Sequence, residues 1–268
     1  MSGGFSAEWL SLREPYDLAA RNDVVLGAVA DAFAGRVSIA VVDLACGTGA
    51  TLRAISGRLS PRQHWRLVDN DLGLLARAAA LGKPPDINVL TRPIDLVCDL
   101  ELALEAPLDL ITASALFDLV SSEWLDRFVI EAAARRLPIY AALTFDGRIS
   151  LEPSEAFDQE IVTAFKAHQR SDKGFGPALG PTAAARAAER FAHVGYVVAE
   201  GRSDWLLESK DAKIQNAVFS AWAELNTLTL PPDVIAKWLA LRRTHVAESR
   251  SRLSIGHADM FARPMGRR

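Results

Sequence analysis

Short, mostly apolar runs rich in β-branched residues punctuate the first half of the chain. Residues 37–44 (VSIAVVDL) form the first of these runs, and a glycine-containing turn follows it directly. Such a run is typical of a strand that is buried on both faces of a parallel sheet. The same pattern predicts further strands in segments 65–68, 87–96, 108–113 and 138–145.

Segments with helical spacing of apolar residues separate these strands. An opening helix is predicted between Pro15 and Gly35, and the later helices are predicted within 50–59, 72–81 and 124–134. Strands that alternate with helices form parallel sheets, because each right-handed crossover places its helix on a sheet face. The predicted fold is therefore α/β, with a Rossmann-like, doubly wound, mostly parallel sheet and flanking helices.

The regular alternation of predicted strands and helices ends after Asp146. The pattern predicts a helix at 156–166, a polar glycine-rich loop at 168–181, a helix ending near Gly195, a strand at 195–206 and a final strand at 254–264. Two amphipathic helices between these strands predict a helical insertion or cap near the C-terminus. We expect a single domain, in which residues 1–36 are an N-terminal helical segment, 37–147 the cofactor-binding core, and 148–268 the remaining sheet and the substrate-side helices.

The glycine turn at residues 43–49 (DLACGTG) lies between the first strand and its helix. Open α/β sheets bind ligands at this position, and glycines allow the backbone to approach a ligand closely. A dinucleotide fingerprint requires a third glycine where this chain has Leu52. A carboxylate at Asp43 suits a cationic ligand instead, and S-adenosylmethionine carries both an ammonium and a sulfonium group.

An acid also ends the second predicted strand, at Asp69 in the sequence LVDND, about twenty residues after the turn. An acid at this place is expected to accept hydrogen bonds from ribose hydroxyls. DLACGTG and LVDND resemble the first and second motifs of class I S-adenosylmethionine-dependent methyltransferases, and the resemblance extends from Val37 to Gly147 and more loosely beyond. It implies S-adenosyl-L-methionine as cofactor, bound by Asp43, Ala45, Cys46, Gly47, Thr48, Gly49, Asp69 and Asn70.

The resemblance implies further cofactor contacts after the third and fourth strands. An acid and an apolar residue normally flank the adenine, and this chain offers two such pairs, between which the sequence does not decide. Ordinary helix caps or loop acids are the alternative interpretation of these residues. The candidates are Asp95 with Leu96, Asp99 with Leu100, Cys98 between the two pairs, and Ser114 with Ala115 after the fourth strand.

Methyl transfer from a sulfonium is an in-line displacement, so orientation supplies much of the rate, and a hydroxyl acceptor gains from a general base. His168 is the candidate base, because it begins a polar, glycine-rich loop with charges of both signs. The alternative is a solvated connection between elements. Substrate contacts are predicted from Asp118, Arg148, Gln169, Asp172 and Lys173.

Other charged and aromatic residues favour structural interpretations. Arg13 and Arg21 flank the opening helix and are expected in solvent, although both could reach a carboxylate of cofactor or substrate. His257 has no partner at metal-ligand spacing. Arginines near the C-terminus are expected to form a solvated face, and they are Arg242, Arg243, Arg250, Arg252, Arg267 and Arg268.

Composition narrows the class of protein. The 268 residues carry a formal net charge of −3, which argues against a general nucleic-acid binder. The first twelve residues do not have a secretory signal pattern, and no stretch reaches the roughly twenty apolar residues of a membrane helix. Cys46 and Cys98 lack the spacing of a metal or disulfide framework. We therefore expect a cytoplasmic protein with free thiols, no metal and no membrane contact.

Together these observations predict an S-adenosylmethionine-dependent methyltransferase that acts on a small molecule. The Asn-Pro-Pro-Tyr type of sequence used in amino methylation is replaced by Ala113-Ser114-Ala115-Leu116, which favours O- or C-methylation. One alternative is a group transferase with another nucleotide-like cofactor. A second is a non-catalytic protein that keeps the fold and regulates a partner. A homodimer is compatible with all of these.

Overall fold

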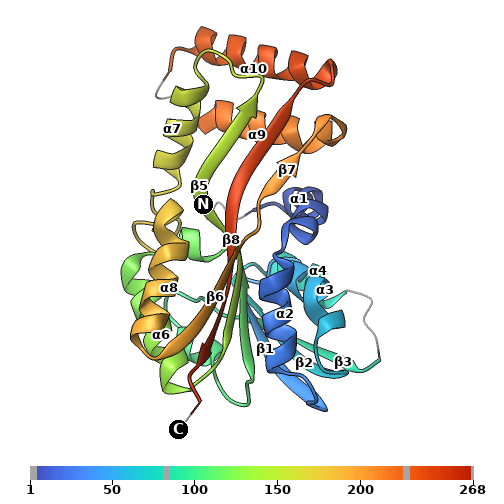
Figure 1. Cartoon of the computed structure of the whole chain (residues 1–268), viewed down its shortest axis with the longest axis vertical. Helices are drawn as coiled ribbons and strands as arrows, with labels where there is room; N and C mark the ends of the chain where they lie inside the picture. The colour runs from blue at the N-terminus through green and yellow to red at the C-terminus, as the bar shows by residue number, and fades with distance from the viewer. Residues whose placement is uncertain (1–4, 81–84, 226–229, 267–268) are drawn as a thin grey trace.

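The computed structural model describes residues 5–80, 85–225 and 230–266. Its centre is an eight-stranded sheet with the order β3-β2-β1-β4-β5-β8-β6, and β7 pairs with β8 (Figure 1). The first five strands are parallel to one another, whereas β8 is antiparallel to β5, β6 and β7. The strands are β1 (Ser38–Leu44), β2 (Arg62–Asp69), β3 (Ile87–Pro93), β4 (Leu110–Ser114), β5 (Ile139–Glu152), β6 (Tyr196–Arg202), β7 (Trp205–Leu207) and β8 (Arg252–Pro264).

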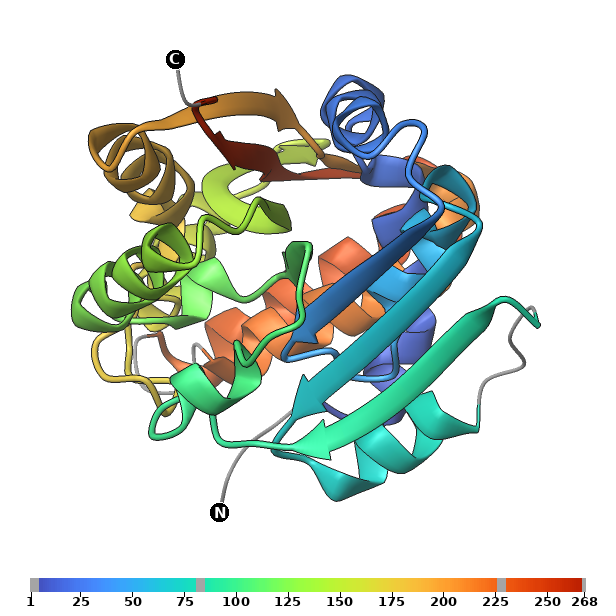
Figure 2. The same ribbon diagram turned by 90° about the horizontal axis from the view of Figure 1, so that it is seen from below.

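Helices cover both faces of this sheet (Figures 1 and 2). Aromatic side chains of α6 and α8 build the core on one face, and aliphatic side chains of α2, α3 and α4 build it on the other. This arrangement confirms the predicted doubly wound, mostly parallel fold. The helices are α1 (Ala7–Ala20), α2 (Asp23–Ala32), α3 (Ala50–Ile55), α4 (Leu72–Ala79), α5 (Leu100–Ala103), α6 (Ser122–Ala134), α7 (Asp158–His168), α8 (Ala183–His193), α9 (Ala212–Leu225) and α10 (Pro232–Ala247).

The N-terminal segment differs from the prediction. Two helices, α1 and α2, replace the single opening helix, and Pro15 lies inside α1 rather than before it. A proline within a helix removes one backbone hydrogen bond. Trp9, Leu12 and Tyr16 of α1 nevertheless pack against a hydrophobic cluster formed by later elements. This tertiary packing outweighs the local preference against a helix around Pro15.

Other boundaries also shift. The predicted strand at 195–206 is divided into β6 and β7, and β5 continues well beyond Phe145. The predicted helix at 72–81 ends at Ala79, and Leu81 lies outside the described residues. The strands predicted at 37–44 and 254–264 are confirmed as β1 and β8.

The second half of β5 and the first half of β8 extend past the parallel sheet as an antiparallel ribbon, paired from Ile149 with Ile255 to Glu152 with Arg252. Figure 1 shows α7, α9 and α10 gathered around the far end of this ribbon. Their apolar faces share a third hydrophobic cluster with the ribbon and with α1. The N-terminal helix therefore bridges the parallel sheet and the late helices.

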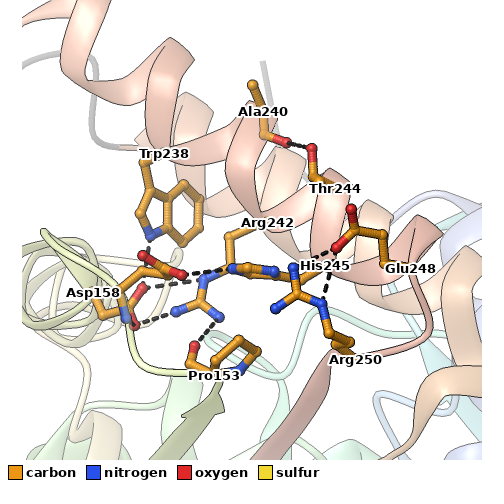
Figure 3. A network of polar contacts seen from close by, with 10 residues as sticks. Pro153, Asp158, Trp238, Ala240, Arg242, Thr244, His245, Glu248 and Arg250 are labelled. Atoms are coloured by element: carbon orange, nitrogen blue, oxygen red, sulfur yellow. Dashed lines mark hydrogen bonds and ion pairs between the residues drawn. The ribbon is translucent and has the colours of Figure 1, made fainter.

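A buried ion pair fixes α10 to the start of α7 (Figure 3). Arg242 is 0% exposed, and it pairs with Asp158 and donates a hydrogen bond of 2.8 Å to the carbonyl of Pro153. Trp238 donates to the same carboxylate, at 2.8 Å. The prediction that Arg242 is solvated is therefore wrong. Arg267 and Arg268 of the same predicted cluster lie outside the described residues.

This ion pair predicts a contrast between neighbouring arginines. Arg242→Ala leaves the Asp158 carboxylate without its ion-pair partner, so we expect a loss of about 3–5 kcal/mol in the free energy of unfolding. Arg243→Ala removes an exposed side chain that donates to Ser220, and a change within about 0.5 kcal/mol is expected. Urea unfolding of both variants measures the difference. Equal losses would contradict the structural role assigned to Arg242.

Candidate functional site

The glycine turn follows β1 at the edge of the sheet where the parallel strands end. β1 lies between β2 and β4, so the chain winds away from this point in both directions. Such switch points form the ligand crevices of open α/β sheets. Gly47 (φ 53°) and Gly49 (φ 80°) adopt left-handed backbone conformations, and Ala45 (φ 51°) does so despite its Cβ. The turn therefore requires a special backbone path.

Asp43 is completely buried beneath this turn. Thr112 of β4 donates a hydrogen bond of 2.7 Å to Asp43 Oδ1. The second carboxylate oxygen, Oδ2, has no hydrogen-bond partner among the described residues. Burial raises the pKa of Asp43 to about 7, because the charged form loses its hydration. A cation placed nearby would favour the ionised form and offset that cost.

Asp69 at the end of β2 holds the turn in place. Its Oδ2 accepts a hydrogen bond of 2.8 Å from the backbone N–H of Gly47, and its Oδ1 accepts one of 3.0 Å from the backbone of Asp71. The side chain is 9% exposed, and burial raises its pKa. Asn70 beside it is exposed. The structure thus brings together the two acids that the sequence assigned to the cofactor.

Helix α1 packs over the turn. A Cβ on Gly47 would lie 3.2 Å from Leu10 Cδ1, so the leucine side chain would have to shift slightly to admit one. Glu14 of α1 accepts a hydrogen bond of 2.6 Å from Arg53 of α3. Arg53 in turn donates to the carbonyl of Thr48 at 2.7 Å. The N-terminal segment is therefore part of the site and covers it.

Arg21, between α1 and α2, is buried at the same sheet edge. It donates to Ser114 at 2.9 Å and to Tyr140 at 3.1 Å, while its Nε finds no partner in the described part of the chain. Thr51 of α3 donates to the same Ser114 hydroxyl at 3.1 Å. The expectation of solvated arginines is wrong for Arg21 and also for Arg13, which is 8% exposed and paired with Asp17.

The remaining residues of the turn and of the β4 exit also lie at this edge. Ala115 follows Ser114 with a left-handed backbone (φ 50°), as Ala45 does after β1. Cys46 is 7% exposed, and its backbone N–H donates to the carbonyl of Val68 at 2.9 Å. The exits of β1, β2 and β4 therefore form one surface around the turn.

The structure favours one of the two acid–apolar pairs after β3. Ile94 donates its backbone N–H to the carbonyl of Asp69 at 3.1 Å, which places Asp95 next to that acid. Leu96 is 5% exposed and lies in the core beside α6. Leu100 is also in that core and 0% exposed, and Asp99 is the N-cap residue of α5. Cys98 is exposed. Asp95 is thus the better-placed acid, and an adenine contact stays a prediction.

Asp118 and Arg148, two of the predicted substrate residues, differ in their surroundings: the first is buried, whereas the second is paired with acids. Asp118, in the turn that follows β4, is 5% exposed, and burial raises its pKa to about 6. Arg148 of β5 instead forms ion pairs with Asp146 of the same strand and with Asp204 between β6 and β7, at 2.5 Å and 2.7 Å. These pairs raise the pKa of the guanidinium and fix it on protein carboxylates.

His168 is the last residue of α7, not the first residue of the loop as predicted. No polar contact within the described residues links it to the glycine turn. Both ring nitrogens of His168 lie near Lys173 Nζ, at 3.1 Å and 3.2 Å. Partial burial and then the lysine charge lower the pKa of His168. Asp172 accepts backbone N–H groups of its own loop, and Gln169 caps the end of α7. These contacts give no support to His168 as a base.

Within residues 5–80, 85–225 and 230–266, no group of three or more His, Cys, Asp or Glu side chains is arranged to hold a metal ion. No helix in those ranges has both the length and the apolar character needed to cross a membrane. Cys46 and Cys98 are free thiols.

The similarity of this chain to known proteins is low. No family model matches the sequence, and no curated protein matches it either. A methyltransferase from Thiobacillus denitrificans, solved with S-adenosyl-L-homocysteine, is 13% identical, with 98% of this chain and 99% of that chain covered and a TM-score of 0.43. A cyclopropane-fatty-acyl-phospholipid synthase-like protein from Lactobacillus casei is 14% identical, with 96% and 94% covered and a TM-score of 0.49.

A third similar structure is a cyclopropane synthase from Mycobacterium tuberculosis. It is 11% identical, with 90% of this chain and 84% of that chain covered and a TM-score of 0.46. With identities of 11–14% and TM-scores of 0.43–0.49, these likenesses carry no argument about what this chain does. The chemistry of the site has to be argued from its own residues.

The buried Asp43 predicts a pH-dependent stability difference. Its pKa is about 7 in the folded protein and near 3.8 when exposed, so between these values the folded state binds the proton more tightly. The contribution of this carboxyl to stability is therefore greatest below pH 4 and is lost as the pH rises to 7. We expect Asp43→Asn to gain stability relative to wild type across that range, by about 1.4 kcal/mol per pKa unit at most.

Chemical unfolding at several pH values between 4 and 7.5 measures this trend. Asp31→Asn is the matched control, because Asp31 lies on the exposed face of α2. A difference between Asp43→Asn and wild type that does not change with pH would contradict the account of the buried carboxylate.

Proposed function

We propose that this chain is an S-adenosylmethionine-dependent methyltransferase that acts on a small-molecule acceptor. One observation carries the proposal: a fully buried carboxylate, Asp43, lies beneath a glycine turn with one oxygen unpaired within the described residues. A second acid, Asp69, ends the neighbouring strand and binds the backbone of the same turn.

The charge of these acids supports a cationic ligand over an anionic one. The pyrophosphate of a dinucleotide would meet Asp43 and Asp69 at the glycine turn, and like charges at short range disfavour each other strongly in a buried site. S-adenosylmethionine brings an ammonium and a sulfonium, which the same acids attract. Leu52 in place of a third glycine agrees with this choice.

Each residue of the site has a role in this proposal. When bound, the cofactor supplies an activated methyl group on its sulfonium. Asp69 accepts hydrogen bonds from the ribose hydroxyls, and Asp95 lies on the adenine side. Asp43 favours positive charge at the turn, and Arg21 offers its Nε to a carboxylate. Helix α1 covers the turn and excludes water, which strengthens these electrostatic interactions.

The acceptor is proposed to be methylated on oxygen or carbon. The exit of β4 carries Ser114 and Ala115, and Asp118 follows in a short 3-10 turn (Phe117–Leu119). No Asn-Pro-Pro-Tyr sequence stands at this position, which supports an acceptor other than an exocyclic amine. The net charge of −3 supports a small molecule rather than a nucleic acid.

Substitution of two acids near the turn tests the cofactor assignment. Asp69→Ala removes the acceptor for the ribose hydroxyls, so the affinity for S-adenosylmethionine is expected to fall at least about tenfold. Asp71→Ala is the matched control, since Asp71 caps α4 through Gly73 and Leu74. It is expected to cost about 1 kcal/mol of stability and to leave the affinity unchanged.

Isothermal titration with S-adenosylmethionine and, separately, with NADH measures both variants and wild type. Binding of S-adenosylmethionine alone is the expected result for wild type. Binding of NADH in its place, or an unchanged affinity in Asp69→Ala, would contradict the proposal.

A further inference from the structure

Three buried polar atoms near the β4 exit lack a hydrogen-bond partner within residues 5–80, 85–225 and 230–266. They are Oδ1 of Asp118, Oγ of Ser203 and Nδ1 of His257, and these side chains are 5%, 0% and 7% exposed. Buried polar groups are almost always paired, because each unpaired one destabilises the fold. Three such groups in one region point to a ligand that supplies the missing partners.

The pairing of strands brings these side chains together. His257 of β8 lies directly opposite Phe145 of β5. On its other side, Ser203 donates its backbone N–H to the carbonyl of His257 at 3.0 Å, one residue beyond the pair Arg202 and Ala258. Side chains of directly opposed residues lie on the same face of a sheet. Phe145, His257 and Ser203 therefore lie side by side on one face.

Asp118 reaches the same place from the β4 exit. The short turn that holds Asp118 (Phe117–Leu119) packs against β5. Burial raises the pKa of the Asp118 carboxyl, and the backbone of Phe145 partly offsets this effect. The positive charge of Arg13 favours the ionised form of Asp118 and the neutral form of His257. Arg13 also lies over the ring of Trp205, at 5.1 Å from its centroid.

The surroundings of the three polar groups are aromatic. The ring of Trp205 is 5.5 Å from that of His257, and the ring of Phe145 is 6.2 Å from it. Tyr16 and Phe165 extend this group, at 6.3 Å from Trp205 and 5.5 Å from Phe145. Aromatic side chains pack favourably edge-on or offset against another ring. A flat ring that carries a hydroxyl matches this combination of aromatic side chains and unpaired hydrogen-bonding atoms.

The cluster also adjoins the proposed cofactor site. Asp118 follows Ser114 in the same β4 exit, and Ser114 is joined to Arg21 and to Thr51 of α3 by hydrogen bonds. Arg13 belongs to α1, the helix that covers the glycine turn. An acceptor held by Asp118 would thus lie at the same sheet edge as the cofactor.

We propose that Asp118, Ser203 and His257 bind the hydroxyl of a phenolic methyl acceptor, and that Asp118 takes up its proton. The inference rests on the proposed function. The phenolic oxygen forms a bond to the methyl carbon while the carbon–sulfur bond breaks, and its electron pair returns to sulfur to give the thioether. The phenolic proton passes to the Asp118 carboxylate, so charge and atoms balance.

The protonation states agree with these roles. Burial raises the pKa of Asp118 to about 6, so the carboxylate is mostly ionised at neutral pH and is a stronger base than an exposed aspartate. Burial and the charge of Arg13 lower the pKa of His257 to about 3, so its ring is neutral and Nδ1 is able to accept a hydrogen bond.

Phenol is the probe for this site. Calorimetric titration of phenol into the protein saturated with S-adenosyl-L-homocysteine is expected to show binding that weakens at least tenfold in Asp118→Asn and in Ser203→Ala. Asp233→Asn, on the exposed start of α10, is the matched control and is expected to bind phenol like wild type. The affinity for S-adenosyl-L-homocysteine is expected to stay within twofold in all three variants.

Two further readouts separate this role from a structural one. Ser203→Ala removes a buried hydroxyl without a described partner, so the melting temperature of the free protein is expected to stay level or rise. With S-adenosylmethionine and phenol, wild type is expected to form anisole, and Asp118→Asn to form it at least tenfold more slowly.

The outcomes distinguish the two proposals. If wild type fails to bind S-adenosyl-L-homocysteine, the proposed function is contradicted. If it binds S-adenosyl-L-homocysteine but not phenol, the phenolic site alone is contradicted. Unchanged phenol affinity in both Asp118→Asn and Ser203→Ala would likewise overturn the site.

Discussion

Burial of carboxylates at one edge of the sheet is the constraint on which the site depends. β1, β2 and β4 run parallel and are neighbours, so their ends bring Asp43, Asp69 and Asp118 to the same edge. Burial raises the pKa of each of them, which means that the fold tolerates their charge at a cost. Proteins accept such costs where function needs them.

The N-terminal segment supplies the opposite charge. Arg13 and Arg21 enter this edge from α1 and from the residue after it, and both are buried among polar partners. Asp259 of β8 accepts hydrogen bonds from the backbone of Asn22 at 3.0 Å and from Tyr140 at 3.1 Å, which fixes the start of α2 against the sheet. The segment thus ties the glycine turn to β8 and, through α1, to the late helices.

The sequence predicted what local patterns determine. The apolar run before the glycine turn, the acid at Asp69 and the doubly wound order follow from periodicity and spacing over short stretches. The prediction that the opening helix starts after Pro15 was wrong. Packing of α1 against distant elements outweighs the local preference against proline within a helix. The burial of Arg242 and the convergence of Ser203 with His257 depend on pairings of β8 and α10 with segments far away in the chain, which single-sequence periodicity does not encode.

A crystal structure of the protein with S-adenosyl-L-homocysteine tests the central claim most directly. The account predicts the ligand at the glycine turn, with its ribose hydroxyls within hydrogen-bond distance of the Asp69 carboxylate and its sulfur on the side of Asp118. A ligand bound elsewhere, or a turn in which Asp69 contacts only the backbone of Gly47 and Asp71 at saturating ligand, would contradict it.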